Sequence, residues 1–247
     1  MSAEQQRTLD ELAEDFAGKL TALTRGVLGE GSPRFHALNM GRRVRVAPIS
    51  ADERVRRIPV SIDGVERLSL LACYYCCWDG QSEFLATDHS EVHVNYKDVP
   101  DPLLRFEYER RLREPPGAHV QIHAHRDEMA YLLRLADGGR PGRKLRHDRL
   151  PRLSEMHVPV GGHRVRPSLE DVLLFLHREF GIDTVQGWKG VIAQHLEEWR
   201  LLQLKSAVRD APDAAAEVLR KLGYQVEAPK VVSPRRPGAD SVKLFWP

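Results

Sequence analysis

The sequence predicts an α+β fold, in which a curved antiparallel sheet follows an amphipathic helix and precedes a helical subdomain. Apolar residues first recur at helical spacing, then alternate with a period of two between about residues 42 and 125, and then return to the helical period. Tight turns separate the alternating stretches. Strands joined this closely must pair antiparallel, because parallel strands need a long crossover connection.

Residues 4–28 form the predicted N-terminal helix, because apolar side chains recur there at three- and four-residue steps. Gly29, Gly31 and Pro33 follow and should end it. We expect this stripe to pack on the sheet of the same chain; the alternative is a helix that binds a partner protein or forms a homodimer. The stripe consists of Leu9, Leu12, Phe16, Leu20, Leu23 and Val27.

Short strands follow between turn signals. Asp63 and Gly64 form a strong turn dipeptide, as do Asp79 and Gly80. Proline-containing turns at 100–102 and 115–117 separate the later strands. The predicted strands lie at residues 43–46, 58–62, 68–78, 84–87, 92–96, 103–111 and 119–125.

The last part of the chain has helical periodicity. Ser168 and Asp171 form a capping box, since each side chain can accept a hydrogen bond from the backbone amide of the other, and Gly181 ends that helix. Helices are predicted at 127–135, 168–180, 185–208 and 213–222. The resulting domain division is an N-terminal helix at 1–33, an antiparallel sheet domain with a histidine site at 34–166, a helical subdomain at 167–228 and an extended tail at 229–247.

Composition excludes several classes of protein. Of 247 residues, 42% are hydrophobic and 29% are charged, which is ordinary for a globular protein and too apolar for a disordered one. The longest apolar runs are far shorter than the roughly 20 residues of a membrane span, and the N-terminus is too acidic for a signal peptide. We therefore expect a cytoplasmic protein without membrane association. The net charge of +2 means that a nucleic-acid interface must be a local patch.

The three cysteines lie together in one predicted strand. Cys73 and Cys76 have the C-x-x-C spacing of a zinc site, and Cys77 follows directly. The chain has no second cysteine pair, and zinc ligands of this spacing normally lie on a turn. We interpret the cysteines as buried core thiols, and their reduced form suits the cytoplasm.

The segment 119–125 is the first candidate site. Alternation places four polar side chains on one face of this strand, and Val120, Ile122 and Ala124 on the other. We expect the apolar face to enter the core and the polar face to line a groove. The polar side chains are His119, Gln121, His123 and His125; the preceding strand would add Tyr108 and Arg110, or Glu107 and Glu109.

A second candidate segment lies before the capped helix. It contains His157, the pair Gly161 and Gly162, which would let the backbone approach a ligand closely, and then Arg164 and Arg166. A helix N-terminus has free amides and a positive dipole end, so it can attract a phosphate. The two arginines could add bidentate phosphate contacts.

Together these segments could cleave a phosphodiester without a metal. The reaction needs a base and an acid that titrate near neutrality, and cations that stabilise the phosphate. His123 or His125 would deprotonate a ribose 2′-hydroxyl, and His157 would protonate the leaving oxygen. The phosphate-binding candidates are Arg110, Arg164 and Arg166, with Arg143 and Lys144 from the basic loop at 140–152, which could equally be a solvated surface loop.

Two alternatives remain open from the residues. No cofactor is expected in the cleavage reaction, but His123, His125 and His157 could instead bind a divalent metal, with Asp127 or Glu155 as a fourth ligand. The histidines could also be a polar cluster at a protein interface.

The order of motifs between about residues 104 and 177 resembles the TumE-like toxins of bacterial toxin–antitoxin systems. The segments that carry it are RFEYERR, HVQIHAH, MHVPVGGHR and the helix SLEDVLLFLHREF. The Arg-Asp-Asn element of that family is replaced here by REPPGAH. The resemblance implies an intracellular toxin that acts on RNA or translation, is neutralised by an antitoxin-like protein partner, and uses the positions of His123, His125 and His157. The sequence thus predicts an RNA-directed, toxin-like ribonuclease, with a non-catalytic interaction module or a metal-dependent hydrolase as alternatives.

Overall fold

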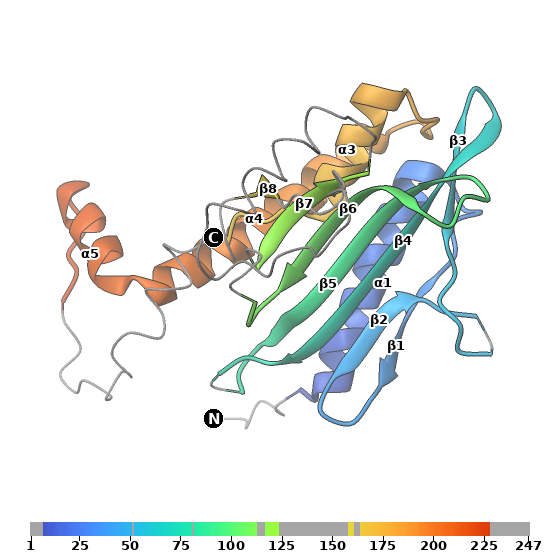
Figure 1. Ribbon diagram of the computed structural model, residues 1–247. Helices are drawn as coiled ribbons and strands as arrows, with labels where there is room; N and C mark the ends of the chain where they lie inside the picture. Colours follow the sequence, from blue (N-terminus) through green and yellow to red (C-terminus); the bar gives the residue numbers. More distant parts are fainter. Residues whose placement is uncertain are drawn as a thin grey trace, which may run out of the picture.

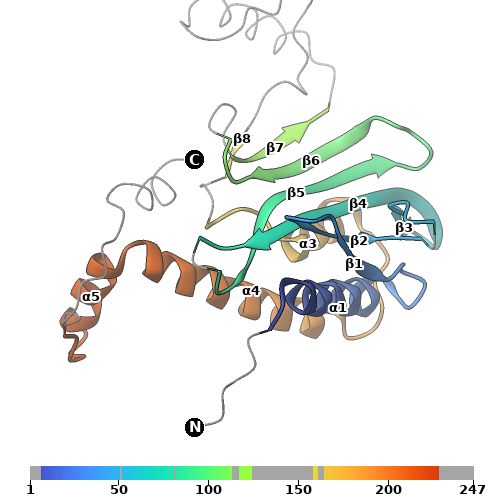
Figure 2. The ribbon, with the colours of Figure 1, turned by 90° about the horizontal axis from the view of Figure 1, so that it is seen from below.

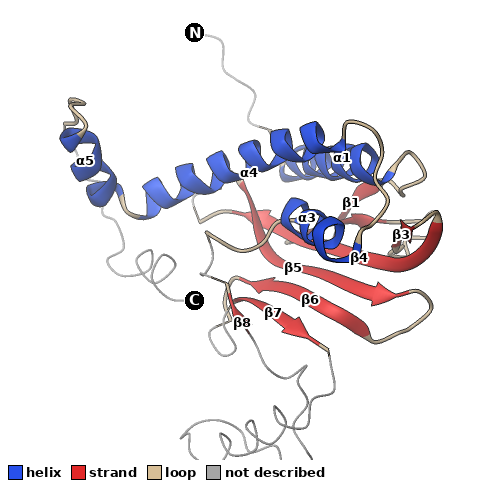
Figure 3. Cartoon of the chain, turned by 90° about the horizontal axis from the view of Figure 1, so that it is seen from above, coloured by secondary structure: helices blue, strands red, loops and turns tan. Residues whose placement is uncertain are grey.

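The computed structural model describes residues 7–50, 52–80, 82–112, 117–123, 158–160 and 164–227. An N-terminal helix, a large antiparallel sheet and C-terminal helices follow one another along the chain (Figure 1). Of the described helices, all but the last lie against one face of a curved sheet that does not close into a barrel (Figures 2 and 3). The α+β class predicted from the sequence is confirmed.

The sheet has eight strands, and every pairing within it is antiparallel. Seven strands lie in the order β1-β2-β4-β5-β6-β7-β8, and β3 pairs with the first part of β4. The strands are β1 (Phe35–Asn39), β2 (Val44–Pro48), β3 (Ile58–Ile62), β4 (Val65–Trp78), β5 (Leu85–Tyr96), β6 (Pro102–Glu109), β7 (Ala118–Ile122) and β8 (Val158–Pro159).

Three features of the sheet differ from the sequence prediction. Strands β1 and β8 were not predicted, and the strands expected at 84–87 and 92–96 form the single strand β5. Asp88 interrupts the apolar pattern of β5 but is buried, because it forms an ion pair with Arg43. A charged residue whose charge is neutralised by an ion pair can therefore lie inside a strand, even where the sequence pattern suggests that the strand ends.

Helix α1 (Leu9–Leu28) begins at a capping box formed by Thr8 and Glu11. Helix α3 (Leu169–Phe180) begins at the predicted box of Ser168 and Asp171, and ends at Gly181 with a φ of 64°. Two further helices follow, α4 (Trp188–Asp210) and α5 (Pro212–Lys221). The helix predicted at 127–135 and the tail predicted at 229–247 lie outside the described residues.

One hydrophobic core joins α1, the sheet, α3 and the beginning of α4. Leu23 of α1, Leu70 of β4 and Leu173 of α3 are all inaccessible to solvent in it. The segments that the sequence analysis separated as an N-terminal helix and a helical subdomain thus share one hydrophobic core with the sheet. Leu20, Leu23 and Val27 of the α1 stripe are buried there, as expected for a helix that packs on its own chain.

Helices α1 and α4 approach closely at Gly26. A β-carbon at Gly26 would lie 2.8 Å from Cγ1 of Val191, whereas one at Gly18 of the same helix would meet nothing within 4 Å. We expect Gly26→Ala to be about 1–2 kcal/mol less stable than Gly18→Ala in urea unfolding, since both gain helix propensity but only Gly26→Ala overpacks the contact. Val191→Ala should remove most of this difference. Equal stabilities of the two alanine variants would contradict the close packing.

None of the helices in the described part of the chain combines the length and apolar composition that crossing a membrane requires.

Candidate functional site

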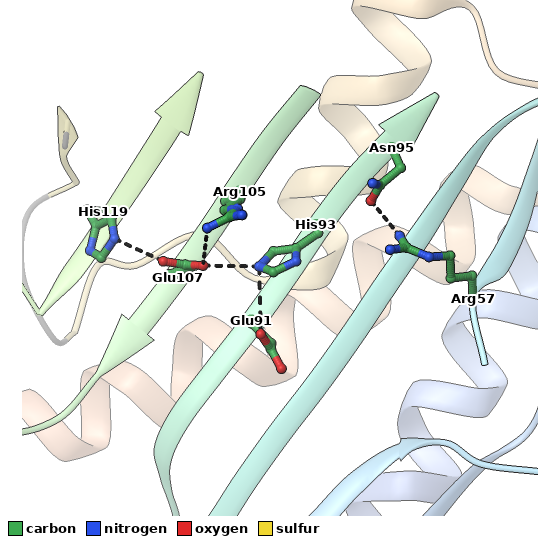
Figure 4. A network of polar contacts seen from close by, with 7 residues as sticks. All are labelled: Arg57, Glu91, His93, Asn95, Arg105, Glu107 and His119. Atoms are coloured by element: carbon green, nitrogen blue, oxygen red, sulfur yellow. Dashed lines mark hydrogen bonds and ion pairs between the residues drawn. The ribbon is translucent and has the colours of Figure 1, made fainter. Parts of the chain in front are cut away.

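A cluster of charged and imidazole side chains lies on the sheet face opposite the helices (Figure 4). The register aligns Glu91 of β5 with Glu107 of β6, and Glu107 with His119 of β7. Phe106 points to the other face, where its ring meets that of Phe175 on α3. We call the five polar residues the histidine–glutamate cluster: Glu91, His93, Arg105, Glu107 and His119.

Glu107 is the centre of this cluster. Its Oε1 lies 3.0 Å from Nε2 of His93, and its Oε2 lies 3.3 Å from Nε2 of His119. Hydrogen bonds from His119 and His93 hold the pKa of the Glu107 carboxyl well below its usual range, and they outweigh the opposing effect of burial. Glu107 is therefore a carboxylate at neutral pH, and it fixes the orientation of two imidazole rings.

One further charge lies beside the Glu107 carboxylate and another beside His93. Arg105 Nη1 lies 4.0 Å from Glu107 Oε1, and Glu91 Oε2 lies 3.7 Å from His93 Nε2. The Arg105 side chain keeps 35% of its surface exposed, whereas that of His119 keeps 4%. A ligand that approaches this face would therefore meet Arg105 and the rim of His93 before it met His119.

His123 follows β7 and extends its ladder, because its backbone amide donates to the carbonyl of Leu103 at 2.9 Å. Burial lowers the pKa of the His123 ring, and the nearby charge of Arg105 lowers it further. Nε2 of His123 is buried and has no hydrogen-bond partner among the described residues. His123 is thus an uncharged imidazole at neutral pH.

The predicted alternation in β7 holds for His119, Gln121 and His123, whose backbone positions alternate with Val120 and Ile122. The predicted burial of the two faces is wrong. His119 and Gln121 are buried, whereas Ile122 is 42% exposed. Ile122 is exposed because the hydrophobic core ends at β6: Leu104 belongs to it, but its β7 neighbour Ile122 does not.

The structure does not bring Arg164 and Arg166 to the histidine face. Arg164 forms two hydrogen bonds with Asp210, of 2.6 and 3.0 Å. The Arg166 guanidinium lies over the rings of Tyr108 and Trp199, 4.2 and 4.9 Å from their centroids. Tyr108 is next to Glu107 in β6, so its side chain lies on the helix side of the sheet.

The other predicted residues have separate positions. Arg110 donates to Sγ of Cys77 at 3.7 Å. Ser168 and Asp171 satisfy each other's amides, which reduces the capacity of this helix N-terminus for a phosphate. Six predicted site residues lie outside the described part of the chain: His125, His157, Arg143, Lys144, Asp127 and Glu155.

The interpretation of the cysteines is confirmed for Cys73 and Cys76, which are buried in the sheet. Burial raises the pKa of the Cys73 thiol to about 11 and that of Cys76 to about 12. Thiols with these pKa values are uncharged at neutral pH, so they are poor nucleophiles and poor metal ligands.

A pair of aromatic rings lies on the same sheet face. Tyr75 of β4 is paired with His89 of β5, with ring centroids 5.4 Å apart and planes inclined by 70°. His89 belongs to the row of alternate β5 residues that continues with Glu91, His93 and Asn95, and Asn95 accepts from Arg57 Nη1 at 2.5 Å (Figure 4).

Sequence reasoning did not select His93, Glu91 or Arg105. Their signal was the period-two order of residues 89–95, His-Ser-Glu-Val-His-Val-Asn, which places the polar side chains on one face. Within the described ranges, no three His, Cys, Asp or Glu side chains are arranged to hold a metal ion.

Comparison with family models, with curated proteins and with solved structures found no match to this chain.

Proposed function

We propose that this protein is an RNA-directed ribonuclease that uses histidine acid–base chemistry. The observation that supports this most is the ionised Glu107 carboxylate held between His93 and His119, with Arg105 beside it, on a sheet face that no described helix covers. Phosphodiester cleavage requires such a set: imidazoles held in a fixed orientation and a cation that faces the ligand.

His123 is the base in this proposal. Its lowered pKa keeps the ring uncharged at neutral pH, as a proton acceptor must be. It takes the proton of a ribose 2′-hydroxyl while the 2′-oxygen forms a bond to phosphorus and the bond between phosphorus and the 5′-oxygen breaks. The products are a 2′,3′-cyclic phosphate and a 5′-hydroxyl end.

His93 is the acid that donates a proton to the leaving 5′-oxygen. Glu107 accepts a hydrogen bond from Nε2 of the ring, so it offsets the charge of the imidazolium and directs Nδ1 away from the carboxylate. Arg105 contributes the cation that stabilises the developing charge on the phosphate. His93 and Arg105 thus replace His157, Arg164 and Arg166 in the roles expected from the sequence.

The ring pair of Tyr75 and His89 favours a single-stranded substrate. Aromatic side chains on an open sheet stack with unpaired bases, at about 1–3 kcal/mol per base. Along β5, His89 and His93 are four residues apart, which corresponds to about 13 Å. One RNA strand could therefore contact the rings and the histidine–glutamate cluster together.

The toxin-like role belongs to the same proposal. A ribonuclease of this kind would act on cellular RNA in the cytoplasm and would be held inactive by an antitoxin-like protein partner. The resemblance of residues 104–177 to TumE-like toxins supports this role, and the polar face is the surface that such an inhibitor would need to cover.

The test is incubation of the purified protein with a single-stranded RNA and with DNA of the same sequence, each with and without EDTA. We expect cleavage of RNA in both conditions, intact DNA, and fragments whose mass shows a cyclic phosphate. Cleavage that EDTA abolishes and added Mn²⁺ restores would support the metal-dependent hydrolase instead. Intact RNA in every sample would contradict the ribonuclease and leave the non-catalytic interaction module.

A further inference from the structure

Two arginines lie on the polar face of the sheet, on the side of β2 and β3. Arg45 stands in β2 between Val44 and Val46, which are both buried in the core. Side chains alternate along a strand, so that of Arg45 points to the polar face. Arg57 directly precedes β3 and reaches Asn95 of β5 (Figure 4). Both arginines therefore share the face that carries the histidine–glutamate cluster.

Arg57 is held in place by a neutral side chain. Its Nη1 donates to Oδ1 of Asn95, which is only 1% exposed. Nδ2 of Asn95 donates to the backbone carbonyls of Val99 and Pro100, at 3.2 and 2.9 Å. These two carbonyls fix the amide group, so its oxygen faces the guanidinium. An amide oxygen orients the Arg57 guanidinium without neutralising its charge.

Arg45 is held in the same way. Its Nη2 donates to the backbone carbonyl of Glu53 at 3.1 Å, and its Nε is buried with no hydrogen-bond partner among the described residues. Neither Arg45 nor Arg57 forms an ion pair with a residue that the structure describes, although Arg43 of the same hairpin pairs with Asp88. Both guanidinium groups are thus oriented by neutral acceptors and keep their charge for an anion.

Arg57 approaches the row of side chains that contains His93. Its partner Asn95 is two residues from His93 in β5 and on the same face, which corresponds to about 7 Å. Arg105 is paired with His93 from β6, whereas Arg57 comes from β3, on the other side of β5. The β5 row that carries the proposed acid therefore has a guanidinium group on each side.

Arg45 lies beside the ring pair. The register aligns Arg45 with Tyr75, and Tyr75 with His89. A nucleic-acid strand has one phosphate per nucleotide, so a strand that contacts both the ring pair and His93 must bring several phosphates to this face. Only one of them is the phosphate that is cleaved.

We propose that Arg45 and Arg57 bind the phosphates that flank the cleaved one, so that the substrate is a single strand of several nucleotides. Planar guanidinium groups suit this role, because they can bind phosphate oxygens in a bidentate manner. The inference rests on the proposed ribonuclease function, and its test therefore measures binding separately from cleavage.

Fluorescence anisotropy with a 2′-O-methyl RNA of about eight nucleotides measures this binding, since the blocked 2′-oxygen prevents cleavage. Each phosphate contact to a single strand contributes about 0.7 to the salt dependence, the slope of log Kd against log salt concentration. Arg57→Gln and Arg45→Gln should each reduce this slope by about 0.7 and raise the dissociation constant about three- to tenfold at about 50 mM salt. The two losses should add in the double variant, because the arginines share no partner. Arg57→Lys keeps the charge and should keep the wild-type slope.

Arg178→Gln is the matched control, because Arg178 is exposed on α3, which covers the opposite face of the sheet. It should leave the slope and the dissociation constant unchanged. Wild-type slopes in Arg45→Gln and Arg57→Gln would overturn the inference, even in a protein that cleaves RNA. Reduced slopes in a protein that cleaves no RNA would support the inference and contradict the ribonuclease. A wild-type protein that does not bind the RNA would overturn it and leave the two arginines for an acidic protein partner.

Discussion

His93→Ala and His123→Ala are each expected to lower kcat/KM for RNA cleavage by about 10²- to 10⁴-fold, the usual contribution of a general acid or base. Truncation of His123 removes the uncharged imidazole that accepts the ribose proton. Truncation of His93 removes the ring that Glu107 orients. Single-turnover cleavage of a short RNA measures both effects, and circular dichroism checks that the fold is retained.

His36→Ala is the matched control, because His36 is exposed on β1, at the opposite end of the sheet from β7. It should retain wild-type activity.

If the proton transfers by His93 and His123 occur in one concerted step, the double variant should be little slower than either single variant. The fall of kcat/KM toward acid pH should occur below pH 6.5, and it should be absent in His123→Ala. Undiminished cleavage by His123→Ala would remove this residue from the mechanism.

Local patterns predict the fold class well here because they report backbone conformation directly. The three- and four-residue steps of α1 and the capping box of α3 both appear in the structure as expected. Alternation also predicts which side chains share a face of β7. Each of these features depends on residues a few positions apart, so the sequence alone contains the information.

Alternation does not predict which face of a strand is covered. His119 is buried although its face is polar. Ile122 is exposed because the apolar core ends at β6, where Phe106 meets Phe175 of α3. The candidate site predicted from the sequence was incomplete because it, too, depends on contacts between residues far apart in the chain. His93 and Glu107 are neighbours only through the register of β5 with β6, and Arg166 lies on the far face because it packs between Tyr108 and Trp199.

Glu107→Gln is expected to lower the free energy of unfolding by about 1.5–3 kcal/mol at pH 7, the range for hydrogen bonds to a charged group. The carboxylate accepts from His93 and His119, and an amide can accept from only one of them while its NH₂ group faces the other. Urea unfolding of both proteins measures the difference. Glu109→Gln is the matched control in the same strand, since Glu109 is exposed, and it should change stability by less than about 0.5 kcal/mol.

The pH dependence separates this charge effect from a packing defect. The folded protein lowers the pKa of Glu107 below 4.5, its ordinary value, so the native state binds this proton less readily than the unfolded chain does. The stabilisation is therefore complete above about pH 4.5 and is lost as the pH falls below it. Wild type and Glu107→Gln should differ most near neutrality and converge in acid. A difference that stays constant from pH 7 to pH 3 would mean that the substituted amide disturbs packing, and that the charge of Glu107 contributes nothing to the cluster.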